Sequence, residues 1–333
     1  MANIYDARGN RYAVVTPEQL RAAGVQMPAA AEQAAACSAR WANAAVELFC
    51  AGEGGWKQHA TDGLLVGPFQ QAAPFDLLIV NTDGSLAERS GNGLTIFAQS
   101  LMDTGLISSG AQFTLRVHHL GRDSGSPVCT PLSSAEHQGI EGFWLDMGAP
   151  AFGAEAVAAK DNLSATSSPA VHRVGALAAV NPGWQRSVFV RLGNPHCVSL
   201  LHSPAELPEM AWLRTTGFDA LRAIAFSSAE VNGKQGAGLG DPCANGINLQ
   251  WAVALNQRSV LARVFERGEG ATLSSGTSAC AVASAMWKDG QLVAGDVQVE
   301  MPGGIAPIRL VENNAALEHV WLFGAASKLP GHV

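Results

Sequence analysis

The chain has 333 residues, of which 47% are hydrophobic and 15% charged, and its formal net charge is −7. This composition excludes an intrinsically disordered chain, and the length suits two domains of ordinary size. The acidic balance, with no basic block, argues against nucleic acid and anionic membrane surfaces as partners.

The N-terminus and the cysteines indicate where the protein works. The first residues contain no apolar core of signal-peptide length, and no stretch approaches the roughly 18 apolar residues of a membrane span. We therefore expect a cytoplasmic protein. The six cysteines are scattered without CxxC pairs, which argues against a disulfide framework and against a zinc site, so no metal is expected.

The elements predicted in chain order are mostly strands. A first strand at 4–15 is interrupted at 8–11, a helix begins at Thr16-Pro17, and residues 29–50 are helix-prone. Further strands are predicted at 62–66, 75–80, 113–118, 143–147, 187–192, 198–201, 246–251, 258–265, 297–301, 305–311 and 319–323. Two central helices are expected at 94–102 and 279–287.

Many strands with few long helices favour mixed α+β halves over doubly wound parallel sheets. We place an N-terminal lobe at residues 1–138, with the tail 322–333 as a candidate to return to it. A C-terminal lobe follows at residues 139–321.

Two stretches share one design, in which a strand and a glycine turn lead to Ser-Gly and a helix. Ser90-Gly91-Asn92-Gly93 opens the first helix, and Ser275-Gly276-Thr277-Ser278 opens the second. The repetition suggests an internal duplication. Free N–H groups and the helix dipole make a helix start a site for an anion. If the halves face each other, both starts converge on one small carboxylate. Alternatively, both serines are ordinary N-caps.

Polar side chains also stand where predicted strands end, at Asn10, Asn81, Asn194, His196, Asn248, Glu266 and Arg267. Together they would suit a zwitterion, because asparagine amides and a glutamate bind an ammonium group and an arginine binds a carboxylate. Simpler explanations remain open. Asn10 and Asn81 could hold turns, Asn194 could accept the restricted geometry before a proline, and Glu266-Arg267 could be a solvated pair.

The order of these blocks resembles that of diaminopimelate epimerases, and the resemblance covers nearly the whole chain. The blocks that carry it are Gly9-Asn10, Asp62-Gly63-Leu64-Leu65, Asn81-Thr82-Asp83-Gly84-Ser85, Ser90-Gly91-Asn92-Gly93, Gly193-Asn194-Pro195-His196-Cys197, Ile247-Asn248, Glu266-Arg267-Gly268-Glu269-Gly270, Gly276-Thr277-Ser278-Ala279-Cys280 and Pro302-Gly303-Gly304. The resemblance implies two pseudo-symmetric lobes, each a mostly antiparallel sheet or barrel around a central helix. It also implies a racemase or epimerase that uses no pyridoxal phosphate or other cofactor.

The same resemblance implies roles for the site residues. Gly91-Asn92 and Gly276-Thr277 would supply backbone donors to the reacting carboxylate. The amino and distal groups would be held by Asn10, Asn81, Asn194, Asn248, Glu266 and Arg267, and His196 would lie near the second catalytic position. Diaminopimelate is the default substrate, which would place the reaction in lysine biosynthesis, and a homodimer is suggested.

The departure from the family pattern lies at the two catalytic positions. Where the family has Cys-Gly-Asn-Gly and Ala-Cys-Gly-Thr, this chain has serine at 90 and at 275. A thiol starts near pKa 8.5 and an aliphatic hydroxyl on the order of 15 to 16, so an alkoxide would cost about 10 kcal/mol more than a thiolate. A helix dipole contributes only about 1 kcal/mol.

Three explanations follow for Ser90 and Ser275. The serines are introduced replacements that trap an inactive enzyme. Alternatively, another base, His196 or Glu266, acts on a substrate with a more acidic proton, as in the alkene isomerisation and dehydration run by related folds. In the third explanation the pocket only binds its ligand.

Overall fold

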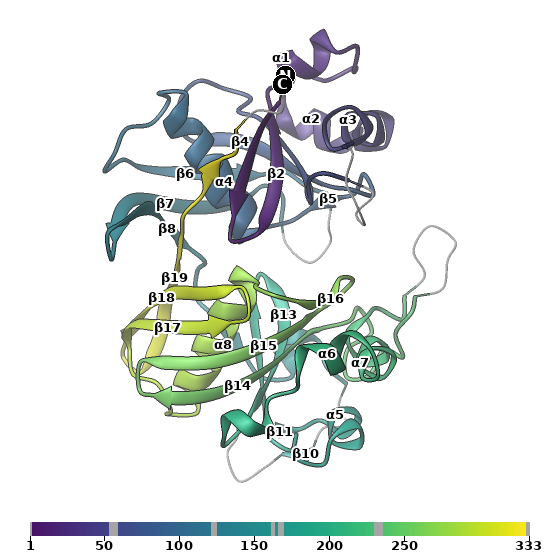
Figure 1. The fold of residues 1–333 in the computed structure, drawn as a ribbon, viewed down its shortest axis with the longest axis vertical. Helices are drawn as coiled ribbons and strands as arrows, with labels where there is room; N and C mark the ends of the chain where they lie inside the picture. The colour runs from purple at the N-terminus through teal and green to yellow at the C-terminus, as the bar shows by residue number, and fades with distance from the viewer. Residues whose placement is uncertain are drawn as a thin grey trace. The chain divides into compact units, whose positions relative to one another are not determined.

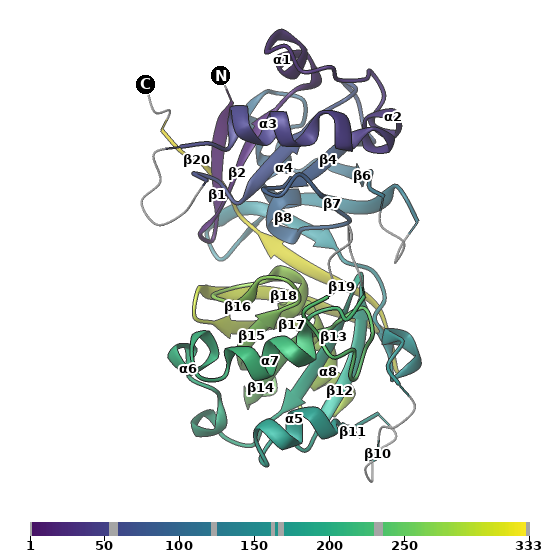
Figure 2. The same ribbon diagram turned by 90° about the vertical axis from the view of Figure 1, so that its right-hand side faces the viewer.

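The chain divides into two compact units, which are described separately. The computed structural model describes residues 2–52, 59–120, 125–160, 164–165, 170–229 and 236–330. Unit 1 comprises Met1–Asp146 and Phe323–Val333, and unit 2 comprises Met147–Leu322 (Figures 1 and 2). The division falls after Asp146 rather than after residue 138, because β8 (Ile140–Asp146) pairs with β7 (Val128–His137) in unit 1.

Unit 1 is built on strands from the first half of the chain. Its strands are β1 (Asn3–Ala7), β2 (Asn10–Val15), β3 (Gly63–Val66), β4 (Phe75–Asn81), β5 (Leu86–Ala87), β6 (Gln112–Val117), β7, β8 and the late β20 (Ser327–Lys328). Its helices are α1 (Pro17–Ala22), α2 (Ala31–Ala36), η1 (Ser38–Arg40), α3 (Ala42–Phe49) and α4 (Gly91–Asp103). The helix start predicted at Thr16 is confirmed, because Thr16 and Gln19 form a reciprocal capping box.

Unit 2 repeats this mixture of many strands and few long helices. Its strands are β9 (Ala151–Phe152), β10 (Ser164–Ala165), β11 (His172–Arg173), β12 (Ser187–Leu192), β13 (Asn194–Leu200), β14 (Asn248–Asn256), β15 (Ser259–Glu266), β16 (Gly270–Thr272), β17 (Gly295–Met301), β18 (Gly304–Asn313) and most of β19 (Ala316–Gly324). Its helices are η2 (Glu155–Val157), α5 (Gly175–Val180), η3 (Pro204–Glu206), α6 (Met210–Arg214), α7 (Phe218–Ala225) and α8 (Gly276–Lys288). The predicted α+β class is confirmed.

The two units share one strand topology. β1 and β2 pair antiparallel, β2 and β3 parallel, and β3 and β4 antiparallel; β12 to β15 repeat this sequence of pairings. β4 and β15 each then bind a short antiparallel strand, the long helix follows, and the next strand returns parallel to them. The repetition suggested by the Ser-Gly motifs therefore extends over β1–β8 and β12–β19.

Each long helix is enclosed by strands of its own unit. α8 contacts β12, β13, β14, β15, β17 and β18, and every residue from 277 to 286 is buried. α4 contacts β1, β2, β8 and β20 and is buried along most of its length. A helix that is buried on all sides needs small or apolar residues all round, which explains the alanine-rich sequence of α8.

The short helices cover the other face of each sheet. In unit 1, Leu64 and Val66 of β3 join a core cluster with Trp41 and Val46 from the α1–α3 region. In unit 2, Trp184 and Trp251 lie in the cluster that includes residues of α5–α7, and their ring centroids are 4.8 Å apart. Both faces of these strands are therefore buried, which explains their nearly continuous apolar runs.

The predicted start of the strand at 198–201 was wrong, because β13 begins at Asn194. Gly193 alone makes the turn with a φ of 72°, so Leu192 pairs directly with Asn194. Asn194 and His196 consequently lie on one face of a strand, because strand side chains alternate.

Candidate functional site

The helix start in unit 1 has the expected capping geometry. Ser90 is the N-cap of α4, and its Oγ accepts a hydrogen bond from the Gly93 N–H at 3.1 Å. The carbonyl of Ser90 accepts from the Leu94 N–H at 2.9 Å. The amides of Gly91 and Asn92 precede the first intrahelical bond, so they are the donors that α4 can offer to an anion.

Sheet register gathers further polar groups at this end of unit 1. Tyr12 of β2 stands opposite Gly63 of β3, which stands opposite Asn81 of β4. Asn92 Nδ2 donates to Asn10 Oδ1 at 3.0 Å, which ties the start of β2 to the first turn of α4. Asn10 and Asn92 are thus in contact; their part in ligand binding stays a prediction.

Asn81 has a local structural task at the same end. Its Nδ2 donates to Ser85 Oγ at 2.9 Å, and its carbonyl accepts from the Gly84 N–H at 2.9 Å. These contacts hold the turn between β4 and β5, which is the simpler of the two explanations considered for Asn81. Its part in ligand binding stays a prediction.

The helix start in unit 2 repeats the first. Ser275 is the N-cap of α8; its Oγ accepts from the Ser278 N–H at 3.4 Å, and its carbonyl from the Ala279 N–H at 2.9 Å. The Ser275 and Thr277 hydroxyls are 3.5 Å apart. Gly276 and Thr277 offer the outward amides, as Gly91 and Asn92 do in unit 1. Both long helices have 13 residues.

Glu266, the last residue of β15, is the ionisable group at this helix start. Burial raises the pKa of its carboxyl, the nearby hydroxyls of Ser275 and Thr272 lower it, and the charge of Glu269 raises it further. The net shift is upward. A carboxyl with a raised pKa can exchange protons nearer to neutral pH than an ordinary glutamate.

The side chain of Asn248 binds the backbone of Arg267. Asn248 Oδ1 accepts from the Arg267 N–H at 2.8 Å, and Arg267 Nη1 donates to the Asn245 carbonyl at 3.0 Å. Asn248 stands beside His196 in the register of β13 and β14. The predicted residues His196, Asn248, Glu266 and Arg267 therefore lie at one end of the unit 2 sheet, and Asn194 begins β13, the strand that carries His196.

His196 lies under the first turn of α8 and is completely buried. Its Nδ1 is 3.0 Å from Gln250 Nε2, which also donates to Ser278 Oγ at 3.1 Å. Burial and then the charge of Arg267 lower the pKa of His196 to about 3. His196 is therefore neutral at physiological pH.

Sequence reasoning missed two residues of this arrangement, Tyr12 and Gln250. Tyr12 Oη lies 3.5 Å from Ser90 Oγ and occupies in β2 the position that His196 occupies in β13. Gln250 lies two residues beyond Asn248 on the same face of β14. Each stands two residues after an asparagine that begins its strand, and this shared spacing is a signal that could have found both.

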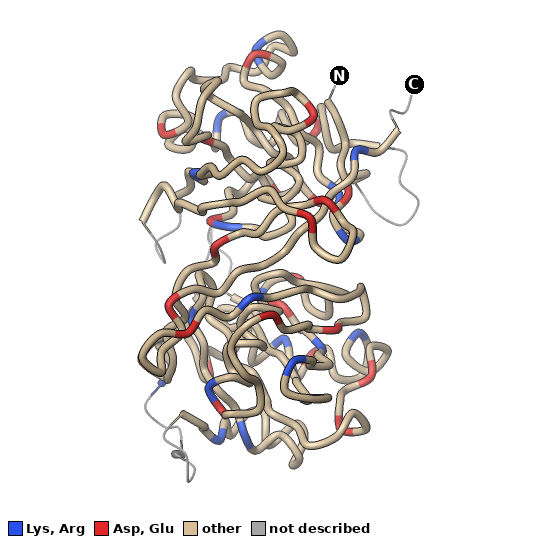
Figure 3. The backbone as a smooth tube through the Cα atoms, turned by 90° about the vertical axis from the view of Figure 1, so that its left-hand side faces the viewer, with Lys and Arg blue, Asp and Glu red and all other residues tan. Residues whose placement is uncertain are grey.

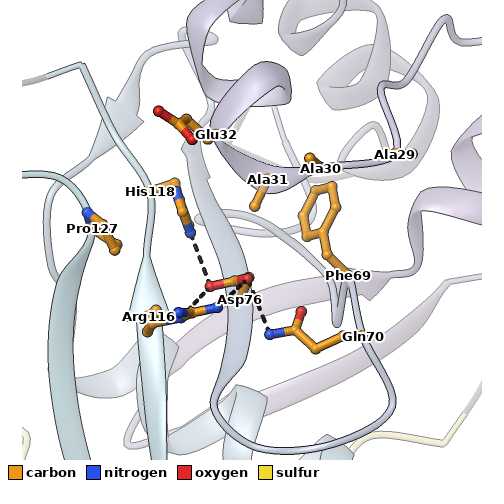
Figure 4. A pocket seen from close by; sticks show the side chains of 10 residues that line it. All are labelled: Ala29, Ala30, Ala31, Glu32, Phe69, Gln70, Asp76, Arg116, His118 and Pro127. Carbon is orange, nitrogen blue, oxygen red and sulfur yellow. Dashed lines mark hydrogen bonds and ion pairs between the residues drawn. The ribbon is translucent and has the colours of Figure 1, made fainter.

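A separate hollow of about 550 Å³ lies at the other end of β4 from Asn81, with Asp76, Arg116, His118 and Phe69 in its lining. Figure 4 shows Asp76 at its centre, contacted by Arg116, His118 and Gln70. Arg116 binds both carboxylate oxygens at 2.6 and 2.7 Å, and His118 Nε2 lies 2.9 Å from Oδ1. Asp76 of β4 is opposite Arg116 in the register of the parallel strand β6. Their ion pair therefore links the two strands through side chains.

Asp76→Asn is expected to lower the free energy of unfolding by about 1.5–3 kcal/mol at pH 7, because it removes charge-assisted hydrogen bonds from a carboxylate whose side chain is only 15% exposed. Burial alone would raise the pKa of Asp76, but the hydrogen bonds and charges of Arg116 and His118 lower it overall. The contribution is therefore complete above the ordinary carboxyl pKa of about 4 and disappears as the pH falls through the lowered value.

Urea unfolding of wild type and variant at pH 7 and pH 3 measures this difference, which should narrow at pH 3. Asp296→Asn is the matched control. Asp296 also binds an arginine, Arg309, at 2.6 Å, but the two side chains are 49% and 42% exposed. That pair should contribute no more than about 1 kcal/mol. If both variants lost the same free energy of unfolding, the larger contribution assigned to Asp76 would be contradicted.

The charged residues of the described chain form neither a one-signed surface (Figure 3) nor a metal-binding cluster. Figure 3 shows basic and acidic residues interspersed along the backbone of each unit. Within the described ranges, no helix is long and apolar enough to cross a membrane. No three His, Cys, Asp or Glu side chains of the described residues gather as a metal ion would require.

Comparison with known proteins finds similarity over most of the chain. The sequence profile of a family described as diaminopimelate epimerase matches residues 241–329. The diaminopimelate epimerase of a Synechococcus species is 30% identical over 259 residues, which is 78% of each chain. Diaminopimelate epimerase 2 of a Nostoc species is 27% identical over 315 residues, or 93% of this chain and 88% of the relative.

A solved structure shares the fold. The crystal structure of methylitaconate-delta-isomerase superposes with a TM-score of 0.57 over 99% of this chain and 93% of that chain, at 11% sequence identity. At that identity the likeness concerns the fold alone.

Proposed function

Because the chain belongs to the diaminopimelate epimerase family, and is thereby an isomerase of the pyridoxal-independent type, we propose that it moves a proton at the carbon beside a carboxylate. The substrate is an amino acid or a related small carboxylate, and diaminopimelate is the first candidate because the similar proteins carry that name. The observation that carries this proposal is the pair of matching helix starts.

The matching helix starts support a role in holding a carboxylate. Each offers two successive amides, from Gly91 and Asn92 or from Gly276 and Thr277, beside a serine N-cap. Backbone N–H groups aimed at a carboxylate also stabilise the enolate-like charge that develops when the neighbouring carbon loses its proton. We propose that the two starts serve one ligand.

The proton acceptor in unit 2 is proposed to be Glu266. Ser275 alone is a poor base, because forming a free alkoxide costs on the order of 10 kcal/mol more than forming a thiolate. Glu266 has a raised pKa, and the nearby Ser275 hydroxyl is among the groups that act on that pKa. The hydroxyl can pass its own proton to Glu266 while it accepts one from the substrate carbon, so no free alkoxide accumulates.

Solvent deuterium exchange tests the proposal. The protein is incubated in D₂O with LL- and meso-diaminopimelate and with a panel of other amino acids, and Cα deuteration is followed by NMR. We expect deuterium at Cα of at least one compound. If a compound raises the thermal melting temperature but never exchanges, the protein is a ligand-binding relative rather than an isomerase.

An asymmetry between the units favours a second candidate function. Glu266 ends β15, while the corresponding residue at the end of β4 is Asn81, which cannot accept a proton at neutral pH. A single acid–base group suits a proton shift along one face of an unsaturated carboxylate. It would also leave Glu266 unavailable as the partner of a substrate ammonium. Deuteration of an alkenoic dicarboxylate, without exchange of any amino acid, would select this alkene isomerase.

A further inference from the structure

One ring nitrogen of the buried His196 has a hydrogen-bond partner, and the other has none among the described residues. Nδ1 contacts Gln250 Nε2 at 3.0 Å, whereas Nε2 is buried and has no hydrogen-bond partner among the described residues. Nearly all buried polar atoms of folded proteins are paired, so an unpaired ring nitrogen beside a candidate site needs an explanation. A ligand that supplies the missing partner would be one.

The contacts of Gln250 determine which nitrogen of His196 carries the proton. An amide nitrogen has two hydrogens and no acceptor capacity. Gln250 Nε2 meets two acceptors, His196 Nδ1 at 3.0 Å and Ser278 Oγ at 3.1 Å. With the amide in this orientation Nδ1 accepts, which leaves the single proton of the neutral imidazole on Nε2; Gln250 Oε1 is then also buried without a hydrogen-bond partner among the described residues.

The direction of Nε2 follows from the strand register. His196 stands beside Asn248, and Gln250 lies two residues further along β14. The two ring nitrogens of an imidazole point in roughly opposite directions. Since Nδ1 contacts Gln250, we infer that Nε2 is on the side of the ring away from Gln250, nearer to Asn248, which binds the Arg267 backbone. The charge of Arg267 is felt at the ring, which agrees with that placement.

We propose that Gln250 is a positioning residue that holds His196 as a neutral Nε2–H donor, and that this donor binds an oxygen of the carboxylate substrate. The proposal rests on the proposed function for the identity of that ligand. His196 then takes no proton from the substrate. It stabilises the negative charge that grows on the oxygen while Glu266 receives the proton through Ser275.

Histidine ¹⁵N NMR of the wild-type protein, without substrate, is the first test. The His196 signals are assigned by their loss in His196→Asn. We expect a protonated Nε2, an unprotonated Nδ1 and no titration between pH 5 and pH 8. A reversed amide, with Gln250 Oε1 accepting from Nδ1–H, would give the opposite tautomer and overturn the proposal. Titration within that range would also overturn it.

Gln250→Glu is the second test, because it keeps the shape of the side chain and replaces the donor by an acceptor. The carboxylate should draw the proton to Nδ1, and kcat should fall by about 10- to 100-fold, the scale expected for a lost oxyanion donor. Gln112→Glu makes the same change at an exposed position of β6 and should leave both the tautomer and kcat unchanged. An altered tautomer with unchanged kcat would contradict a donor role.

Adding meso-diaminopimelate to the labelled wild type separates the two levels of the proposal. A shift of the His196 Nε2 resonance is expected on binding, and its absence while Cα exchange proceeds would exclude the donor role. If no carboxylate exchanges at all, the proposed function fails, while the tautomer measured without substrate still decides whether Gln250 positions His196. The wild-type spectrum needs no variant to fold.

Discussion

Glu266→Gln is expected to lower kcat for proton transfer by roughly 10²- to 10⁴-fold, the usual contribution of a positioned general base. The amide keeps the size of the side chain and can still contact the neighbouring hydroxyls, but it cannot accept a proton. Deuterium exchange under saturating substrate measures the change. A variant that retains wild-type kcat would show that another group accepts the proton.

The pH profile of the same reaction supplies an independent readout. Glu266 must be deprotonated to act as a base, so kcat/KM should rise with pH through its pKa, which burial places above the ordinary glutamate value of about 4.3. Glu269→Gln is the matched control. Its negative charge raises the pKa of Glu266, so its removal should move the acid limb to lower pH and leave the plateau nearly unchanged. If the acid limb of the kcat/KM profile did not move in Glu269→Gln, the assignment of Glu266 as the base would be contradicted.

The double variant Ser90→Cys/Ser275→Cys is expected to epimerise diaminopimelate at least about 10²-fold faster than the wild type, because a helix N-terminus lowers a thiol pKa toward neutrality while a hydroxyl remains far from it. Each single variant places one thiol and should exchange the Cα proton with little inversion. Chiral chromatography and NMR separate inversion from exchange. The loss of each serine cap should also cost about 1 kcal/mol of stability.

Ser284→Cys is the control for the double variant. It places a thiol in α8, buried and away from the helix start, where the serine hydroxyl donates to the Cys280 carbonyl at 2.8 Å. It should add no exchange. If the double variant stays inactive on every amino acid while the wild type deuterates an alkenoic acid, the site has diverged from epimerases and the second candidate function is selected.

Local sequence signals were sufficient for the elements with strong end markers. The helix starts at Ser90 and Ser275 follow from Ser-Gly after a strand and a turn, and both serines are N-caps, the simpler of the two explanations that the sequence left open. Family membership rests on the same blocks and is confirmed by the relatives. The start of the strand at Asn194 was missed because a single glycine with a positive φ is enough to make the turn after Leu192.

The hydrogen-bond partners of the site residues could not be predicted from local sequence signals. The sequence presented Asn81 and Asn92 alike, yet Asn81 holds a turn with Ser85, and Asn92 reaches across to Asn10. Gln250 carried no signal until strand register placed it beside His196 and the first turn of α8 placed Ser278 within reach.

By itself, the sequence determined the α+β class, the two repeated Ser-Gly helix starts, the family and the absence of cysteine at residues 90 and 275, because each depends on residues that are neighbours along the chain. The tertiary structure alone decided that Glu266 is the ionisable group at Ser275, that His196 is buried and neutral, and that Tyr12 faces Ser90. A pKa and a hydrogen bond depend on burial and on partners from distant strands, and only the pairing of those strands supplies them.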